Sequence, residues 1–464
     1  MTSPHFISFP SDFLWGAATT SFQIEGSPLA DGAAKSNWYN WTKTPGKVDR
    51  GEDANTACDH YHRYREDVAL MKQMGLQTYR MSLSWPRIIP ERGRVNVKAL
   101  DFYRRLIDEI KAAGIVPCVT LFHWEVPEWM KGEWENPQIV EAFREYAEVV
   151  FKAFGKDVPL WATHNEPVVV AQLGYLDGPF PPGRTDRKAY AQVVHHLNLS
   201  HNVAVKTYKD LGFKGEIGWV QSLTTFKTIH QKPEELKHAK NLDDLFNHVL
   251  LAPSAGSSYP AFLFDYSGEP AAKYEKELKA VQQPIDFLGM NHYFPNYTRR
   301  APGDNIIDNL NDLPPGIAQN DLNCPVEPIS MYELLTMLWK EYGYKKIFIT
   351  ENGFPTRDSA RTAEETMQDD VRIHYLGTYL EAIHRAIKEG VPVKGYYAWS
   401  FLDNFEWCFG YDPRFGLIHV DWKTQKRTFK KSAHWYKKVI QDKGFDLAAL
   451  TSKPTYRYYK PAVS

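Results

Sequence analysis

The sequence predicts an α/β fold: a single (β/α)8 TIM barrel over residues 1–464 with long loops after its strands. Amphipathic helical stripes alternate with β-rich segments, a glycine closes the stripes, and eight β-rich segments can be counted. This alternation predicts a parallel sheet, and eight strands predict its closure into a barrel. No Ser- or Pro-rich linker divides the chain, and such barrels reach this length as one domain when their loops carry insertions.

The eight predicted strands are spread over the whole chain. In order, they are FLWGAAT (13–19), QTYRMSLSW (77–85), VPCVTLFHW (116–124), LWATHNEP (160–167), EIGWVQS (216–222), FLGMNHYF (287–294), KIFITENG (346–353) and VKGYYAWS (393–400). Segment 301–327, rich in Pro, Gly, Asn and Asp, follows the sixth strand, and we interpret it as a long loop beside the pocket.

The predicted helices follow from the spacing of apolar residues. One stripe consists of Tyr61, Tyr64, Val68 and Met71, and a second of Leu100, Tyr103, Ile107 and Ile110. Glycines end these and four similar units, at Gly75, Gly114, Gly155, Gly212, Gly343 and Gly390. We expect each glycine in the left-handed conformation, which a residue without a Cβ enters without a clash.

Composition and charge argue against several classes of partner. The net charge is −1, from 55 basic and 56 acidic residues, which disfavours nucleic acid and anionic membranes. No apolar run reaches the ~18 residues of a membrane span. The four cysteines lie far apart, as free thiols in a reducing compartment would, and we expect neither metal nor cofactor. No secretory signal is evident at the N-terminus, so we expect a cytoplasmic location.

Residues whose side chains can bind a substrate or take part in catalysis lie at the ends of the predicted strands. They are Arg80, His123, Asn165, Glu166, Gln221, Asn291, Tyr293, Glu351 and Trp399. In (β/α)8 barrels the active site is built at this rim, whereas residues serving only stability would be spread over both strand ends. The clustering therefore indicates an enzyme.

Two of these residues form the pair that glycoside hydrolysis needs. One carboxyl group protonates the leaving oxygen, and a second carboxylate acts from the opposite face of the sugar. Glu166 ends the fourth strand and Glu351 the seventh, so closure of the barrel can bring both to one bond. Most glutamates are solvated, but a lone charge at the end of a buried strand is costly without a purpose.

Seven motifs carry a family resemblance. They are FLWGAATTSFQIEG (13–26), YRMSLSWPRIIP (79–90), TLFHWEVPEW (120–129), THNEP (163–167), MNHY (290–293), ITENG (349–353) and WSFLDNFEWCFGYDPRFG (399–416). With them the chain resembles family 1 glycoside hydrolases, the β-glucosidase family, over nearly its whole length. Seven motifs in the expected order are far more specific than one.

The resemblance implies a retaining β-glucosidase that acts on cellobiose, short β-oligosaccharides or aryl and alkyl β-glucosides. Glu351 would be the nucleophile, and Glu166 the acid and then the base. Arg80 would favour the ionised form of Glu351, whereas a drier setting would keep Glu166 protonated. The residues implied in substrate binding are Gln23, His123, Asn165, Asn291, Tyr293, Trp399, Glu406 and Trp407.

Some residues leave alternatives open. His164 replaces the usual Phe of the TFNEP motif, and it would either alter the titration of Glu166 or fill space between strand and helix. Glu125 replaces a more common Asp. Gln221 and Asn291 are weaker candidates, because amides at strand ends can simply cap loops, and we expect Gln221 not to touch substrate.

The residues that contact the leaving group are not marked by any motif. We expect variable loops to build it, including segment 301–327 and the residues around Trp219 and Phe226. Cys408 has no expected chemistry and is interpreted as a packing residue near the pocket mouth. The sequence does not indicate an oligomeric state.

Particular residues argue against several other activities. A broad β-glycosidase that prefers galactosides or fucosides is the main alternative. A 6-phospho-glycosidase is disfavoured because the carboxylate of Glu406 would repel a phosphate dianion, and a thioglucosidase would carry Gln at position 166. A non-catalytic sugar-binding relative would typically lack one of the two carboxylates, since fold alone does not fix function.

Overall fold

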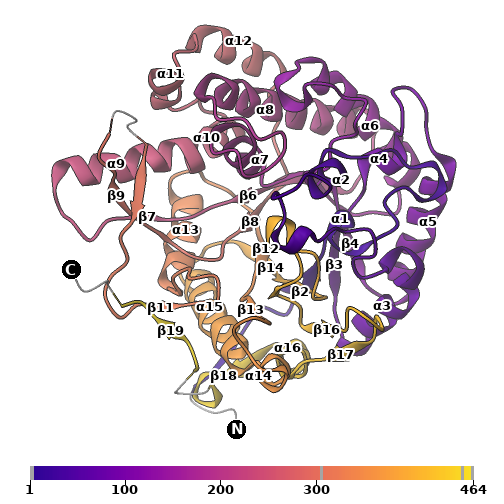
Figure 1. Ribbon diagram of the computed structural model, residues 1–464, viewed down its shortest axis with the longest axis vertical. Helices are drawn as coiled ribbons and strands as arrows, with labels where there is room; N and C mark the ends of the chain where they lie inside the picture. The colour runs from indigo at the N-terminus through magenta and orange to yellow at the C-terminus, as the bar shows by residue number, and fades with distance from the viewer. Residues whose placement is uncertain (1–4, 304–306, 451–453, 461–464) are drawn as a thin grey trace.

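The computed structural model describes residues 5–303, 307–450 and 454–460. Its centre is a closed barrel of parallel strands, paired in the order β12-β14-β2-β3-β4-β5-β6-β8, and helices surround it (Figure 1). The barrel strands are β2 (Leu14–Ala18), β3 (Thr78–Ser82), β4 (Val116–Phe122), β5 (Leu160–Asn165), β6 (Glu216–Ser222), β8 (Phe287–Asn291), β12 (Ile347–Asn352) and β14 (Val393–Trp399). Each lies within one of the eight predicted segments, so the predicted barrel is confirmed.

The principal helices alternate with the strands along the chain. They are α3 (His60–Met74), α5 (Val97–Ala112), α6 (Gln138–Phe154), α8 (Arg187–Asp210), α12 (Ala271–Val281), α13 (Ile329–Lys340), α15 (Asp370–Lys388) and α16 (Lys431–Asp442). Shorter helices are α1 (Ser21–Ile24), α2 (Asn37–Thr42), α4 (Trp85–Ile88), α7 (Pro167–Ala171), α9 (Pro233–Asp243), α10 (Val249–Ser254), α11 (Ala261–Ser267) and α14 (Ala363–Gln368). Within the described ranges, no helix combines the length and apolarity that crossing a bilayer requires.

The helix-ending glycines follow the prediction with one exception. Positive φ angles occur at Gly75, Gly114, Gly212, Gly343 and Gly390. Gly155 instead has a φ of −60°, so the prediction is wrong there. A Cβ at this position would lie 2.6 Å from the carbonyl oxygen of Phe151 and 2.7 Å from the ring of Phe213. Close packing, rather than a left-handed turn, therefore requires this glycine.

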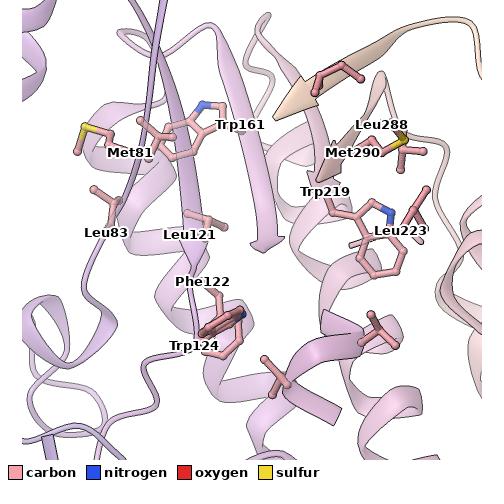
Figure 2. Close-up of a cluster of buried hydrophobic side chains, with 14 of the residues drawn as sticks. Met81, Leu83, Leu121, Phe122, Trp124, Trp161, Trp219, Leu223, Leu288 and Met290 are labelled. Carbon is pink, nitrogen blue, oxygen red and sulfur yellow. The ribbon is translucent and has the colours of Figure 1, made fainter. Parts of the chain in front are cut away.

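Two apolar cores lie on opposite faces of the sheet. The inner core fills the barrel with Ala18, Cys118, Leu160, Phe287, Phe348, Tyr397, Trp399 and Phe415. The outer core lies between strands and helices, and Figure 2 shows part of it, including Trp161 and Trp219. Trp219 stacks on His201 of α8 with ring centroids 4.0 Å apart. Trp219 itself therefore faces a helix, whereas Ser222 and Leu223, which follow it, line the larger of the two cavities described below.

Segment 301–327 is less irregular than expected. Strand β10 (Asn309–Asn311) pairs with β9 (Asn296–Arg300), which pairs with β7 (Phe226–Lys227). Strand β11 (Ala318–Gln319) pairs with β19 (Arg457–Tyr458), and Figure 1 shows the two side by side. The remaining short strands are β1 (Phe6–Ser8), β13 (Thr356–Arg357), β15 (Pro413–Arg414), β16 (Ile418–Val420), β17 (Arg427–Phe429) and β18 (Gly444–Asp446).

Candidate active site

A cavity of about 170 Å³ lies at the carboxyl ends of the barrel strands. Eight predicted residues line it: Gln23, His123, Glu166, Tyr293, Glu351, Trp399, Glu406 and Trp407. The two glutamates expected to share one bond thus face one compartment. This is the arrangement that the predicted chemistry requires.

Glu351 lies near the end of β12 and accepts two strong hydrogen bonds. Arg80 Nη1, from β3, donates to its Oε1 at 2.6 Å, and the Tyr293 hydroxyl donates to its Oε2 at 2.7 Å. Arg80 is 1% exposed and Glu351 is 4% exposed. Water therefore screens this ion pair little, and each oxygen of Glu351 has a hydrogen-bond donor.

Glu166 occupies a different electrostatic environment. It follows β5 and precedes Pro167 at the start of α7, with a left-handed φ of 45°. Asn291 Nδ2 donates to its Oε1 at 3.0 Å. Burial, and after it the charge of Glu351, raises the pKa of Glu166 to about 8. Glu166 therefore carries a proton at neutral pH.

Two buried amides connect these carboxyl groups. Asn165 Oδ1 accepts from Arg80 Nη2 at 2.5 Å and from Asn291 Nδ2 at 3.1 Å. Asn165 Nδ2 lies 3.0 Å from His123 Nε2. Burial holds the pKa of His123 well below its usual range, so the neutral ring accepts this hydrogen bond through Nε2. Arg80, Asn165 and Asn291 thus support the lining residues.

A third carboxyl group, that of Glu406, lies in the same cavity. Burial, followed by the charges of Glu351 and Glu166, raises the pKa of Glu406 to about 8. Gln23 Nε2 donates to the Asn404 side chain at 2.9 Å, to the Phe405 carbonyl at 2.8 Å and to Glu406 at 3.4 Å. Within the described chain, only Glu351 of the three carboxyl groups forms an ion pair.

Aromatic rings form much of the remaining wall. The ring of His123 lies nearly parallel to those of Trp399 and Trp407, at centroid distances of 6.3 and 6.1 Å. Trp407 also contacts Trp124 at 4.6 Å. The wall needs Gly353, because a Cβ there would lie 1.8 Å from the Trp399 carbonyl oxygen. This close approach explains the glycine of ITENG.

Six lining residues were not predicted from the sequence: Trp124, Phe294, Asn320, Leu322, Pro355 and Phe415. Trp124 and Phe415 belong to quoted motifs and could have been selected from them. Asn320 and Leu322 lie in segment 301–327, where no motif or periodicity marks them.

The open questions about His164 and Gln221 are resolved by burial. His164 is fully buried, Nε2 lies 3.0 Å from the Ser200 hydroxyl of α8, and its ring packs 4.5 Å from that of Phe143. It fills space between strand and helices, so the second interpretation holds. Gln221 is buried and is not among the residues that line the cavity, as expected.

Two further side chains lie close to the site. Glu125 accepts a hydrogen bond from the Ser21 hydroxyl at 3.0 Å, and burial, followed by the charge of Glu25, raises the pKa of Glu125 to about 7. Cys408 is half-buried beside Trp407, with its Sγ 3.3 Å from the Pro179 carbonyl oxygen. Cys408 is thus a packing residue next to a residue that lines the cavity, as predicted.

A larger cavity of about 540 Å³ lies beside the first. Tyr293 and Phe294 line both cavities. Val168, two residues after Glu166, also lines the larger one. Its apolar lining also includes Val169, Leu176, Leu223, Phe226, Leu242, Phe246 and Ile307. Phe226 and three residues of segment 301–327, Ile307, Asp308 and Asn309, thus line this second cavity.

Known proteins are similar to this chain in sequence. A family model described as Glycosyl hydrolase family 1 matches residues 5–445. Beta-glucosidase A of Acetivibrio thermocellus is 40% identical over 446 residues, which cover 95% of this chain and 99% of that protein. Beta-glucosidase A of Thermotoga maritima is 40% identical over 445 residues, covering 94% and 99%.

Solved structures agree. A Thermotoga maritima beta-glucosidase in complex with glucoimidazole superposes with a TM-score of 0.88 at 39% identity, covering 94% of this chain and 100% of that one. A Thermotoga maritima family 1 glycoside hydrolase complexed with a cyclophellitol analogue transition state mimic gives a TM-score of 0.90 at 39% identity, covering 95% and 100%.

Proposed function

Because the chain belongs to glycosyl hydrolase family 1 and is a glycoside hydrolase, we propose that it is a retaining β-glucosidase. Its substrates would be terminal β-D-glucosyl residues of cellobiose, short β-oligosaccharides or aryl and alkyl β-glucosides. One observation carries the proposal: two carboxyl groups share a cavity of about 170 Å³, and an arginine pairs with only one of them.

The reaction proceeds by double displacement. Glu351 attacks the anomeric carbon, the bond to the leaving oxygen breaks, and Glu166 transfers its proton to that oxygen. A glycosyl-enzyme ester on Glu351 results. Glu166, now a carboxylate, takes a proton from water, which attacks the anomeric carbon and releases β-glucose together with the free Glu351 carboxylate.

The electrostatics support this division of roles. A nucleophile must be ionised, and Arg80 supplies a positive charge at 2.6 Å from Glu351. An acid must carry a proton at the working pH, and the pKa of Glu166 is raised to about 8, chiefly by burial. Water that attacks the intermediate finds Glu166 as a base, because the acid has then given up its proton.

The two cavities support a substrate bound by its non-reducing end. The small cavity is below the ~300–1,000 Å³ typical of drug-sized ligands, which suits one pyranose ring. Gln23, His123, Glu406 and Trp407 would hydrogen-bond its hydroxyl groups, Trp399 would stack on it, and Asn165 would reach its 2-hydroxyl. The leaving group would enter the larger cavity beyond Glu166, where an aryl or alkyl group finds apolar side chains.

The assignment is tested by hydrolysis of nitrophenyl β-glucoside. Glu351→Ala should reduce turnover by several orders of magnitude, and Glu234→Ala, at an exposed position on α9, should leave it unchanged. Undiminished turnover in Glu351→Ala would exclude the proposed nucleophile. Early release of α-glucose would exclude retention. A panel with galactosides, fucosides and 6-phospho-glucosides measures the sugar preference.

We further propose one barrel domain over residues 1–464 and a cytoplasmic location. Free thiols at Cys58, Cys118, Cys324 and Cys408 support a reducing compartment. Cell fractionation tests the location, and limited proteolysis tests the domain.

A further inference from the structure

We infer that residues 454–460 are part of the substrate-binding apparatus, because they hold the pocket loop, defined as residues 317–326, against the small cavity. The inference rests on the proposed function in one respect: the small cavity must be the glucosyl site. Segment 454–460 lies outside residues 5–445, which the family model matches. The family match therefore assigns no role to it.

The pocket loop contributes directly to the cavity wall. Asn320 and Leu322 line the cavity, and Leu322 packs against the inner core that contains Trp399 and Phe415. The Asn320 Oδ1 atom accepts hydrogen bonds from the backbone N–H groups of Leu322 at 2.9 Å and Cys324 at 3.0 Å. The loop thus has a defined turn, but its position relative to the barrel depends on outside contacts.

Asp321, at the tip of this turn, supplies one such contact. Its side chain is fully buried and accepts two hydrogen bonds from Arg361, at 2.8 and 2.9 Å. The backbone N–H of Arg357 donates to Asp321 at 3.1 Å, and Arg457 lies 3.6 Å away. A buried carboxylate is costly without such partners, so these contacts fix the loop between Asn320 and Leu322.

Segment 454–460 completes this attachment. Strands β11 and β19 are antiparallel, with Ala318 opposite Tyr458 and Gln319 opposite Arg457. Arg361, which binds Asp321, also donates to the Thr455 hydroxyl at 3.1 Å and to its carbonyl oxygen at 3.2 Å. One arginine therefore joins the pocket loop to the segment.

Tyr456 anchors the segment to a second loop of the cavity. Its ring lies 5.8 Å from that of Phe354 and 5.5 Å from that of His374, and its hydroxyl is 3.0 Å from His374 Nδ1. Phe354 follows the ITENG motif and precedes Pro355, which lines the cavity. The segment therefore bridges two loops on the nucleophile's side of the cavity.

The segment is too small to hold the barrel together. Strand β19 has two residues, both exposed, and weakly protected elements of this kind contribute little to global stability. Its contacts are instead concentrated on the two loops that line the sugar cavity. Its loss should therefore loosen the cavity wall and leave the barrel folded.

The test compares deletion of residues 451–464, Tyr456→Ala and the control Leu236→Ala, at a position on α9 that is 47% exposed and lines neither cavity. Calorimetry measures the Kd for glucoimidazole, and nitrophenyl β-glucoside gives KM and kcat. We expect Kd and KM to rise about tenfold in the first two variants, because a loosened wall must be ordered again when the sugar binds. The kcat should stay nearly unchanged, because Glu166 and Glu351 are held by other contacts. Leu236→Ala should match the wild type.

Thermal melting establishes that each variant is folded. An unchanged Kd in the folded deletion variant would overturn the inference; if the deletion does not fold, an unchanged Kd in Tyr456→Ala would do so. A loss in kcat alone would also overturn it, because the wall would then not serve binding. Failure of the wild type to hydrolyse glucosides would overturn the proposed function instead, and the Kd comparison would still test the segment.

Discussion

Two chemically identical substitutions in the cavity should change stability in opposite directions. Glu166→Gln removes a carboxyl group whose pKa is raised to about 8, chiefly by burial. Glu351→Gln removes one that is paired with Arg80 at 2.6 Å. We expect the first variant to be more stable than the wild type at neutral pH and the second to be less stable.

The magnitude for Glu166 follows from proton linkage. The pKa of Glu166 is near the ordinary glutamate value of 4.5 in the unfolded chain and about 8 in the folded chain. Between these values the folded state binds more protons, so its stability falls as pH rises. At 1.36 kcal/mol per pKa unit, the carboxyl group costs ~3 kcal/mol at pH 7. With an unfolding entropy that scales with length, glutamine should raise Tm by about 3 °C.

The magnitude for Glu351 has a different origin. Glutamine leaves the buried Arg80 without its counter-charge, and breaking a buried ion pair costs ~3–5 kcal/mol. The amide nitrogen would also face either Arg80 or the Tyr293 hydroxyl, both of which donate to the wild-type carboxylate. The Tm should therefore fall by several degrees.

Calorimetric melts at pH 5, 7 and 8 measure both effects. The gain from Glu166→Gln should grow with pH over this range, and the exposed control Glu234→Gln should show no shift. The reasoning would be refuted by a gain that does not depend on pH, or by shifts of the same sign in the two cavity variants.

Three further results are expected. The kcat/KM for nitrophenyl β-glucoside should fall about tenfold per pH unit above pH ~8, because Glu166 then loses the proton it must donate; a flat profile to pH 10 would contradict this. His164→Phe should not change the pH at which kcat/KM begins to fall, because burial holds the pKa of His164 well below 6.5 and the imidazole stays neutral. A shift of this fall in a pH–rate profile would show that His164 and Glu166 are electrostatically coupled. Asp403→Asn should lower the free energy of unfolding by ~3–5 kcal/mol in denaturant titrations, because buried Asp403 pairs with Lys430 at 2.6 Å and Arg414 at 2.9 Å; an unchanged midpoint would refute it.

The barrel and most of the cavity could be predicted because their signals are local. A strand, a helical stripe and a terminal glycine are each read within about 20 residues, and strand ends indicate the rim. Asn320 and Leu322 could not be predicted in this way. Their positions depend on the pairing of β11 with β19, which lies far away in the sequence, and no local pattern encodes such a contact.

Periodicity alone does not predict the direction in which the side chains at the strand ends point. Along β12, Ile347 and Ile349 face the outer core, and strict alternation would aim Glu351 outward as well. The pairing register shifts between Ile349 and Glu351. Such irregularities redirect side chains, and here Glu351 faces the cavity.

The same reasoning explains His164 and Gln221. Along β5, Leu160 belongs to the inner core, so alternation would aim His164 into the barrel. The register shifts between Ala162 and Asn165, His164 packs against the helices instead, and Asn165 reaches Arg80. Strand β6 pairs with β8 without a register shift, and along it Gln221 keeps the outward face of Trp219 and does not line the cavity. The register shifts in β5 and β12 thus turn Asn165 and Glu351 toward the cavity. Gln221, on a strand without such a displaced residue, stays on the outer face.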